Sequence, residues 1–210
     1  MSDLSARRPI KTRDTSFARA CAKGLLKTGL SPNMVSVLSV IFAILCAGCM
    51  YLTEQNIYWW IGAAVCIPLR LLCNLFDGMM AVEGGKGSAT GDIYNELPDR
   101  ISDVVIIATA GYYTACPFGV TLGWIAASAA LLTAYARAHG ASLTGKHDFG
   151  GPFAKAHRMI TLAVCFVILP FSNSFGFDLL FYTLALVAIG TLLTVTLRYR
   201  RLAQALIKAA

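Results

Sequence analysis

Charged residues are scarce in this sequence of 210 residues. Only 14% of them are Asp, Glu, Lys or Arg, and 57% are hydrophobic, whereas a soluble domain has about 25% charged and about 45–50% apolar residues. This balance excludes an ordinary soluble domain and predicts a single polytopic membrane domain over residues 1–210. Acidic residues are the scarcer sign, and the net charge of +7 indicates contact with anionic membrane lipids and no nucleic-acid partner.

Other absences narrow the class further. The seven Cys residues predict no disulfide framework, because their number is odd and all but Cys21 lie in apolar segments. Cys46 and Cys49 form a C-x-x-C pair with no His nearby, which predicts neither metal nor redox chemistry. The first thirty residues lack the apolar core of a signal peptide, so we expect the N-terminus to stay in the cytoplasm. No repeat of the kind found in transporters is present.

Six apolar segments are long enough to cross a bilayer as helices. They cover about residues 34–52, 58–82, 92–113, 120–138, 156–171 and 177–197. Residues 1–30 read as a cytoplasmic tail followed by an amphipathic helix over Thr15–Gly29 that lies in the membrane surface, with a solvated basic tail as the alternative. We therefore expect an all-α fold in which an N-terminal interfacial helix precedes a six-helix core over residues 31–200.

Lys and Arg are confined to alternate connections between these segments. They occur before the first span, in the second and fourth loops and after the sixth span, whereas the loops around Glu54, Pro117 and Asn173 have none. Cytoplasmic loops carry the excess of basic residues. The pattern predicts that both termini lie in the cytoplasm.

Polar residues gather between the second and third spans, where ionisable groups are expensive and indicate function. On the helix that enters this stretch, one face carries Arg70, Asn74, Asp77, Gly78 and Ala81. On the helix that leaves it, one face carries Asp92, Asn95, Glu96, Asp99 and Asp103. A short Gly-rich turn joins the two helices, so we expect the faces to meet. Clustered carboxylate and amide oxygens suit Mg²⁺ or Mn²⁺, and such an ion suits a phosphate-bearing substrate.

The same stretch resembles the signature of the CDP-alcohol phosphatidyltransferases, D-x-x-D-G-x-x-A-R followed by G-x-x-x-D-x-x-x-D. With all spacings intact, the matching residues are Asp77, Gly78, Ala81, Gly91 and Asp99. Ser31-Pro32-Asn33 also resembles the family's S/T-x-P-N opening. The resemblance covers nearly the whole chain.

Three positions depart from the signature. Asn74 and Asn95 stand where the family has Asp, and Val82 stands where it has Arg. A bacterial branch that resembles this chain carries Asn at the same two positions, followed by Glu, as in Asn95-Glu96. We therefore interpret the site as a variant in which Glu96, together with Asp92, restores negative charge. Lys86 and Arg70 are the two candidates to replace the missing Arg.

The resemblance implies transfer of a phosphatidyl group from CDP-diacylglycerol to a small alcohol, with release of CMP, by a homodimer. It implies that Asp99 is the catalytic base and that Mg²⁺ or Mn²⁺ is held by Asp77, Asn74, Asn95 and Asp99, to which we add Glu96. Gly78, Ala81 and Gly91 would leave room for the nucleotide. For the small residues alone, close helix packing is the alternative.

The acceptor side is predicted from two further elements. Tyr135-x-Arg137-Ala138 and Gly151-x-x-x-Lys155-x-His157-Arg158 resemble elements of family members that use inositol phosphate. Arg137, Lys155 and Arg158 would form a cationic cluster for a phosphorylated polyol such as glycerol 3-phosphate or inositol phosphate. The alternative is that these residues only anchor the cytoplasmic side, and His157 in place of the family's Glu argues against a direct transfer of the acceptor.

Two other functions remain open from the sequence. A catalytically silent relative that binds CDP-lipid as a regulatory subunit is motivated by Asn74, Asn95 and Val82. A small transporter or channel is motivated only by the charge within the membrane. The acids lie at helix ends beside a Gly-rich loop, which favours the enzyme over the transporter.

Overall fold

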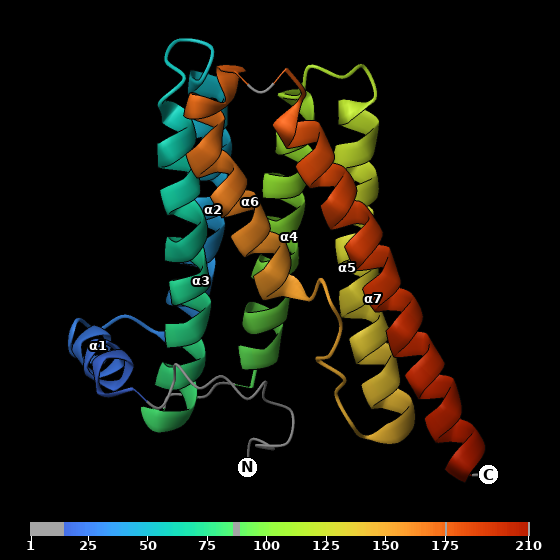
Figure 1. Ribbon diagram of the computed structural model, residues 1–210. Helices are drawn as coiled ribbons and strands as arrows, with labels where there is room; N and C mark the ends of the chain where they lie inside the picture. Colours follow the sequence, from blue (N-terminus) through green and yellow to red (C-terminus); the bar gives the residue numbers. More distant parts are fainter. Residues whose placement is uncertain (1–14, 86–88, 175, 210) are drawn as a thin grey trace.

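The computed structural model describes residues 15–85, 89–174 and 176–209, and in these ranges the chain is helical and contains no strand. The helices are α1 (Ser16–Lys27), α2 (Pro32–Leu52), α3 (Trp59–Glu83), α4 (Gly91–Tyr112), α5 (Gly119–Thr144), α6 (Lys155–Ile168), the 3₁₀ helix η3 (Leu169–Ser174) and α7 (Leu179–Ala209). Helices α2 to α7 form an elongated bundle, and α1 lies beside its lower end (Figure 1). The predicted all-α fold is confirmed.

Local sequence signals set several helix ends. The hydroxyl oxygen of Ser31 accepts a hydrogen bond from the Met34 amide at 3.2 Å, and Pro32 is the first residue of α2, as expected for a Ser N-cap followed by Pro. Helix α5 ends where Gly145 takes a φ of +69°, the left-handed conformation common at helix C-termini. These signals fix where the chain turns back into the bundle.

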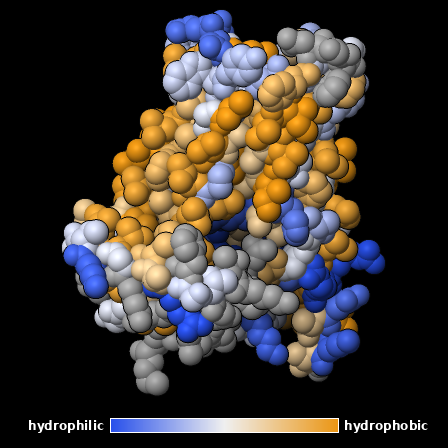
Figure 2. Space-filling view, turned by 60° about the vertical axis from the view of Figure 1, so that its left-hand side comes forward, coloured by the Kyte–Doolittle hydropathy of each residue, from blue (hydrophilic) through white to orange (hydrophobic). Residues whose placement is uncertain are grey.

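The bundle has the composition of a membrane protein. Within the described ranges, helices α2, α3, α5 and α7, and α6 with its 3₁₀ extension, are long and apolar enough to cross a bilayer. Figure 2 shows apolar side chains over the middle of one face, with hydrophilic residues at both ends. Helix α4 runs among the others (Figure 1) but contains Glu96, Asp99, Arg100 and Asp103. The polytopic class is confirmed, while the count of six spans stays a prediction.

Two helices continue beyond the predicted spans. Helix α5 continues past Ala138 to Thr144, and α7 continues past Leu197 to Ala209. Hydropathy marks only the apolar part of a helix, whereas the backbone hydrogen bonds continue into polar sequence. The extra length of α7 matters for the site, because it carries Arg198 and Arg201 alongside the loop between α5 and α6.

The amphipathic helix expected over Thr15–Gly29 is present as α1. Its residues Ala18 and Ala22 are buried against Leu75 and Met79 of α3. The hydroxyl of Thr15 caps it by accepting a hydrogen bond from the Ala18 amide at 3.3 Å. Helix α1 therefore packs on the C-terminal part of α3, which belongs to the polar stretch.

The opposite end of the bundle is held by Asp178. Its Oδ2 accepts hydrogen bonds from the amides of Ala115 and Cys116 at 2.6 and 3.1 Å. Its Oδ1 accepts one from the Phe181 amide at 2.9 Å. One carboxylate thus joins the loop between α4 and α5 to the start of α7, far along the bundle from α1.

Candidate functional site

Asp99 lies at the centre of a polar cluster where α3, α4 and α6 meet. Its Oδ1 atom accepts hydrogen bonds from Nη2 of Arg70 at 3.2 Å, from Nδ2 of Asn74 and from Nζ of Lys155. Arg70 and Asn74 lie on α3, and Lys155 is the first residue of α6. Donors from α3 and α6 therefore converge on one carboxylate oxygen of α4. The contact of Asn74 with Asp99 agrees with the helical spacing.

Asp77 is a second buried carboxylate at this site, with 3% of its surface exposed. Its Oδ2 accepts a hydrogen bond from the Ser36 hydroxyl of α2. Its Oδ1 has no hydrogen-bond partner among the described residues, and it interacts electrostatically with Asp99 and Lys155. A buried oxygen without a partner is costly unless a ligand satisfies it, so Asp77 is suited to hold a cation.

The predicted metal ligands do not all come together. Asp77, Asp99 and Asn74 share the cluster and offer carboxylate and amide oxygens, the donors that Mg²⁺ and Mn²⁺ prefer. Asn95 is exposed on α4, and the structure described contains no group of three His, Cys, Asp or Glu side chains arranged to hold a metal. The fit to a divalent cation therefore rests on two acids and one amide.

Glu96 forms ion pairs with two arginine side chains. Both of its carboxylate oxygens accept hydrogen bonds from Nη2 of Arg137, the Oε1 contact at 2.6 Å, and Oε2 also contacts Arg100. The Arg137 guanidinium lies 5.3 Å from the centroid of the Phe149 ring, a favourable cation–π distance. Glu96 thus joins α4 to α5 and fixes Arg137 beside the loop that leads to Lys155.

Arg158 is buried, with 2% of its surface exposed. Its Nη2 donates to Oδ2 of Asp103 at 2.8 Å, and its Nη1 donates to the Thr133 hydroxyl and the Phe153 carbonyl at 3.2 and 3.0 Å. The predicted cationic cluster is therefore divided, because Arg158 faces Asp103 while Lys155 faces Asp99. Arg137 and Lys155 are half-buried.

The loop between α5 and α6 is attached to α7. Nε of Arg198 donates to the Gly150 carbonyl at 3.0 Å, and its Nη1 donates to the Thr133 carbonyl of α5. The Phe153 amide donates to the Thr194 hydroxyl at 3.0 Å. At Gly151, φ is +137°, a conformation that favours glycine. These contacts hold the loop that places Lys155.

Of the remaining predicted nucleotide-binding residues, Gly78 and Ala81 lie in the last two turns of α3 and Gly91 begins α4, whereas Arg70 lies in the middle of α3. Gly78, Ala81 and Gly91 are half-buried, and Arg70 is completely buried. Lys86 lies outside the described residues. Figure 2 shows a hollow with hydrophilic residues inside it, below the apolar middle of that face.

Sequence reasoning placed Asp103 on the polar face without a specific role, and it did not single out three other residues that contact the site or its loop, Ser36, Thr133 and Arg198. Asp103 had a usable signal, since it follows Asp99 by one helical turn on the predicted polar face. Ser36 and Thr133 had none, because a hydroxyl in an apolar helix more often bonds to its own helix backbone. Arg198 looked like one of several basic residues after the last span.

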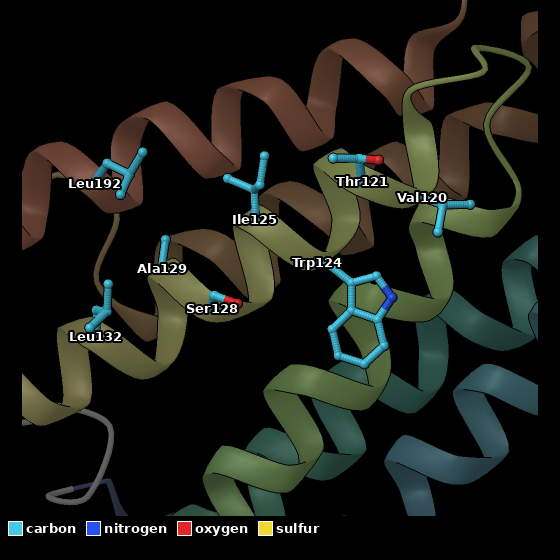
Figure 3. A pocket seen from close by; sticks show the side chains of 8 residues that line it. All are labelled: Val120, Thr121, Trp124, Ile125, Ser128, Ala129, Leu132 and Leu192. Carbon is cyan, nitrogen blue, oxygen red and sulfur yellow. The ribbon is translucent and has the colours of Figure 1, made fainter.

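A groove on the outer face of α5 is separate from this polar cluster. It is lined by Val120, Thr121, Trp124, Ile125, Ser128, Ala129, Leu132 and Leu192, and Figure 3 shows these side chains along α5 with Leu192 on α7. The lining is mostly apolar and includes none of the predicted site residues. It is typical of a surface that faces lipid.

Comparison with known proteins identifies relatives of this chain. Residues 29–197 match the family described as CDP-alcohol phosphatidyltransferase. The phosphatidylinositol phosphate synthase of Mycolicibacterium smegmatis is 27% identical over 156 residues, which span 70% of this chain and 66% of that protein. The chain thus spans just under two thirds of the length of this curated relative.

Solved structures of the Mycobacterium tuberculosis phosphatidylinositol phosphate synthase share the fold. One with CDP-DAG bound has a TM-score of 0.70 at 23% identity, covering 90% of this chain and 94% of that chain. Another in complex with manganese and citrate has a TM-score of 0.69 at 23% identity, covering 88% of each. Residues 29–197, which match the family model, include the Asp77–Asp99 stretch and the loop that leads to Lys155. As the resemblance in sequence predicted, the chain belongs to the CDP-alcohol phosphatidyltransferase family.

Proposed function

We propose that the protein transfers the phosphatidyl group of CDP-diacylglycerol to the hydroxyl of a small phosphorylated alcohol and releases CMP, in phospholipid biosynthesis. One observation carries this proposal. The buried carboxylates of Asp77 on α3 and Asp99 on α4 interact electrostatically, and Lys155 contacts Asp99. This arrangement combines an acid pair for a cation with a basic group for a phosphate.

Asp99 is the general base in this proposal. It accepts the proton of the acceptor hydroxyl, whose oxygen then forms a bond to the phosphorus of the phosphatidyl group, while the bond from that phosphorus to the CMP oxygen breaks. Arg70 and Asn74 orient the carboxylate through their contacts with Oδ1. For proton transfer, the acceptor must approach Asp99 beside Lys155.

Mg²⁺ or Mn²⁺ is the proposed cofactor, and a relative of the same fold was solved with manganese. Asp77, Asp99 and Asn74 would hold the ion, since Oδ1 of Asp77 has no hydrogen-bond partner among the residues described. When bound, the ion would neutralise negative charge on the diphosphate. Asn95 and Glu96, which we also predicted as ligands, would join only after Glu96 leaves Arg137. Gly78, Ala81, Gly91 and Lys86 remain the proposed nucleotide contacts.

The acceptor is proposed to be a phosphorylated polyol, such as inositol phosphate or glycerol 3-phosphate. Lys155 and Arg137 are half-buried cations beside the site, and guanidinium and ammonium groups bind phosphate through charge-assisted hydrogen bonds. The curated relative is a phosphatidylinositol phosphate synthase, which favours inositol phosphate. His157 is exposed and stands where the resembling family members have Glu, so glycerol 3-phosphate belongs in every test.

We further propose that the site faces the cytoplasm of a bacterium from its inner membrane, with both termini on that side. The loop between α5 and α6 contains Lys146 and ends at Lys155, and Arg198 and Arg201 contact it. This loop lies toward the lower end of the bundle (Figure 1). Excess Lys and Arg mark the cytoplasmic side. Membrane lipids are the surrounding partners, and a homodimer remains the proposed assembly.

The first experiment measures CMP release by the purified protein in lipid, with CDP-diacylglycerol and either Mn²⁺ or Mg²⁺. Inositol phosphate, glycerol 3-phosphate, inositol, glycerol and serine are compared as acceptors. We expect fast release with a phosphorylated acceptor and only slow release with inositol or glycerol. We expect Asp99→Asn to lower the rate by about 10²- to 10⁴-fold, because that variant cannot accept the proton. Asp178→Asn, at the opposite end of the bundle, serves as the matched control with unchanged rate.

A catalytically silent relative is the second candidate, favoured by Asn74, Asn95 and Val82. Each replaces a charged residue of the family signature with a neutral one. Saturable binding of CDP-diacylglycerol, with no CMP release from any acceptor and no effect of Asp99→Asn, would replace the enzyme with this function.

A further inference from the structure

A single buried carboxylate connects the two sides of the proposed site. Asp103 lies on α4 one turn after Asp99, and 1% of its surface is exposed. Its Oδ1 accepts a hydrogen bond from Nη2 of Arg70 on α3 at 2.6 Å, and its Oδ2 accepts one from Nη2 of Arg158 on α6 at 2.8 Å. Each carboxylate oxygen of Asp103 thus bonds to an arginine from a different helix.

On the α3 side, the contact determines where Arg70 lies. The same Nη2 atom that bonds to Asp103 also donates to the Asp99 carbonyl at 3.1 Å and to Oδ1 of Asp99 at 3.2 Å. The other guanidinium nitrogens of Arg70, Nε and Nη1, have no hydrogen-bond partner among the described residues. The position of Arg70 against the proposed base therefore depends on Asp103.

On the α6 side, the contact determines where the first turn of the helix lies. Arg158 is tied to Asp103, Thr133 and the Phe153 carbonyl, and Lys155 lies three residues before it on the same helix face. Lys155 contacts Oδ1 of Asp99. Asp103 therefore acts on Asp99 from two directions, through Arg70 and through the helix that carries Lys155.

The negative charge of Asp103 holds two buried guanidinium groups close together. The side chains of Arg70, Asp103 and Arg158 are each at most 2% exposed. Two guanidinium groups on one carboxylate stay close only while the negative charge is present, because buried like charges repel strongly when they are not compensated. A neutral residue at position 103 would let Arg70 and Arg158 move apart.

We propose that Asp103 is a positioning residue for phosphatidyl transfer, which sets the distance between Asp99 and Lys155 through Arg70 and Arg158. This assignment rests on the proposed function. It also gives the buried Arg158 a role as a positioning residue behind Lys155, in place of the direct acceptor contact expected from the sequence. Neither Asp103 nor Arg158 touches the substrates in this arrangement.

The test compares Asp103→Asn, Arg158→Gln and the double variant with the wild type, measuring kcat and the KM of each substrate by CMP release. We expect Asp103→Asn to lower kcat by about 10- to 100-fold, because small displacements of catalytic groups cost this much, while the KM for CDP-diacylglycerol is unchanged. Because both changes break the same contact, the double variant should lose no more than the worse single variant.

The outcomes separate this proposal from the proposed function. The double variant removes one negative and one positive charge, so it decides the question if Asp103→Asn alone does not fold. The role of Asp103 would be overturned, and the proposed function would stand, if Asp103→Asn or the double variant kept the wild-type kcat. The same holds if the losses of the two single variants multiply in the double variant. No transfer by the wild type to any acceptor would overturn the proposed function and this assignment with it. Asp178→Asn, which changes a structural carboxylate at the opposite end of the bundle, controls for lost stability.

Discussion

At the scale of single residues, the charge of Lys155 is expected to decide which acceptor is used. Its ammonium is half-buried and contacts Oδ1 of Asp99, whereas Nη1 of Arg100 lies 3.5 Å from Oδ2. Lys155→Met keeps the apolar stem and removes the charge. We expect the KM for the phosphorylated acceptor to rise about 10- to 100-fold, since a hydrogen bond to a charged group contributes about 1.5–3 kcal/mol. The measurement is CMP release against acceptor concentration.

Two comparisons make this result specific. Lys155→Arg keeps a positive charge and should recover most of the affinity for the phosphorylated acceptor. The slow reaction with unphosphorylated inositol or glycerol should be unchanged in Lys155→Met. Equal losses with phosphorylated and unphosphorylated acceptors would show that Lys155 acts on Asp99 alone and does not bind the acceptor phosphate.

Sequence spacing predicted which residues of the polar stretch share a helix face, but it did not predict their partners. Arg70, Asn74 and Asp99 meet as the 3.6-residue period requires. Asp92 and Asn95 lie on the predicted face of α4 yet are exposed, because they precede the part of the helix that enters the bundle. The pairing of Asp103 with Arg158 depends on how α6 packs, and a pattern within one helix carries no information about that.

At the scale of elements, glycine determines how closely α4 and α5 approach. A Cβ atom at Gly123 would lie 2.9 Å from Cα of Gly111 and 3.2 Å from the Ala108 carbonyl oxygen. These are backbone atoms, which cannot turn aside as a side chain can. Small residues at such crossings let membrane helices pack closely, and α4 and α5 also carry the Glu96–Arg137 ion pair.

We therefore expect Gly123→Ala to destabilise the protein by about 1–3 kcal/mol, the usual cost of overpacking. The thermal unfolding midpoint in detergent measures the effect. Gly48→Ala on α2 is the matched control, because a Cβ atom there meets nothing within 4 Å, and alanine favours a helix by up to about 1 kcal/mol. Equal unfolding midpoints for the two variants would contradict close packing at Gly123.

At the scale of the whole molecule, the arrangement of charge along the bundle indicates which end carries the proposed site. Runs of Leu, Ile and Val predict helices, but they do not predict which helices pack against each other. Only the polar segments of this sequence carry such information. The class and approximate spans followed from hydropathy, and the site from its spacing. The ends of α5 and α7 and the attachment of the loop to α7 through Arg198 required the three-dimensional packing.

The same arrangement predicts the topology. Gln55 and Lys146 are both exposed, and they lie in turns at opposite ends of the bundle (Figure 1). In a background with Cys21→Ser and Cys116→Ser, we expect a membrane-impermeant thiol reagent to label Gln55→Cys in spheroplasts, and to label Lys146→Cys only after lysis, because basic loops stay in the cytoplasm. The reverse pattern would place Asp99 and Lys155 outside the cell, away from the cytoplasmic supply of nucleotide-activated lipid that the proposed reaction consumes. Labelling of both sites in spheroplasts would instead mean that this bundle does not separate its two ends across a bilayer.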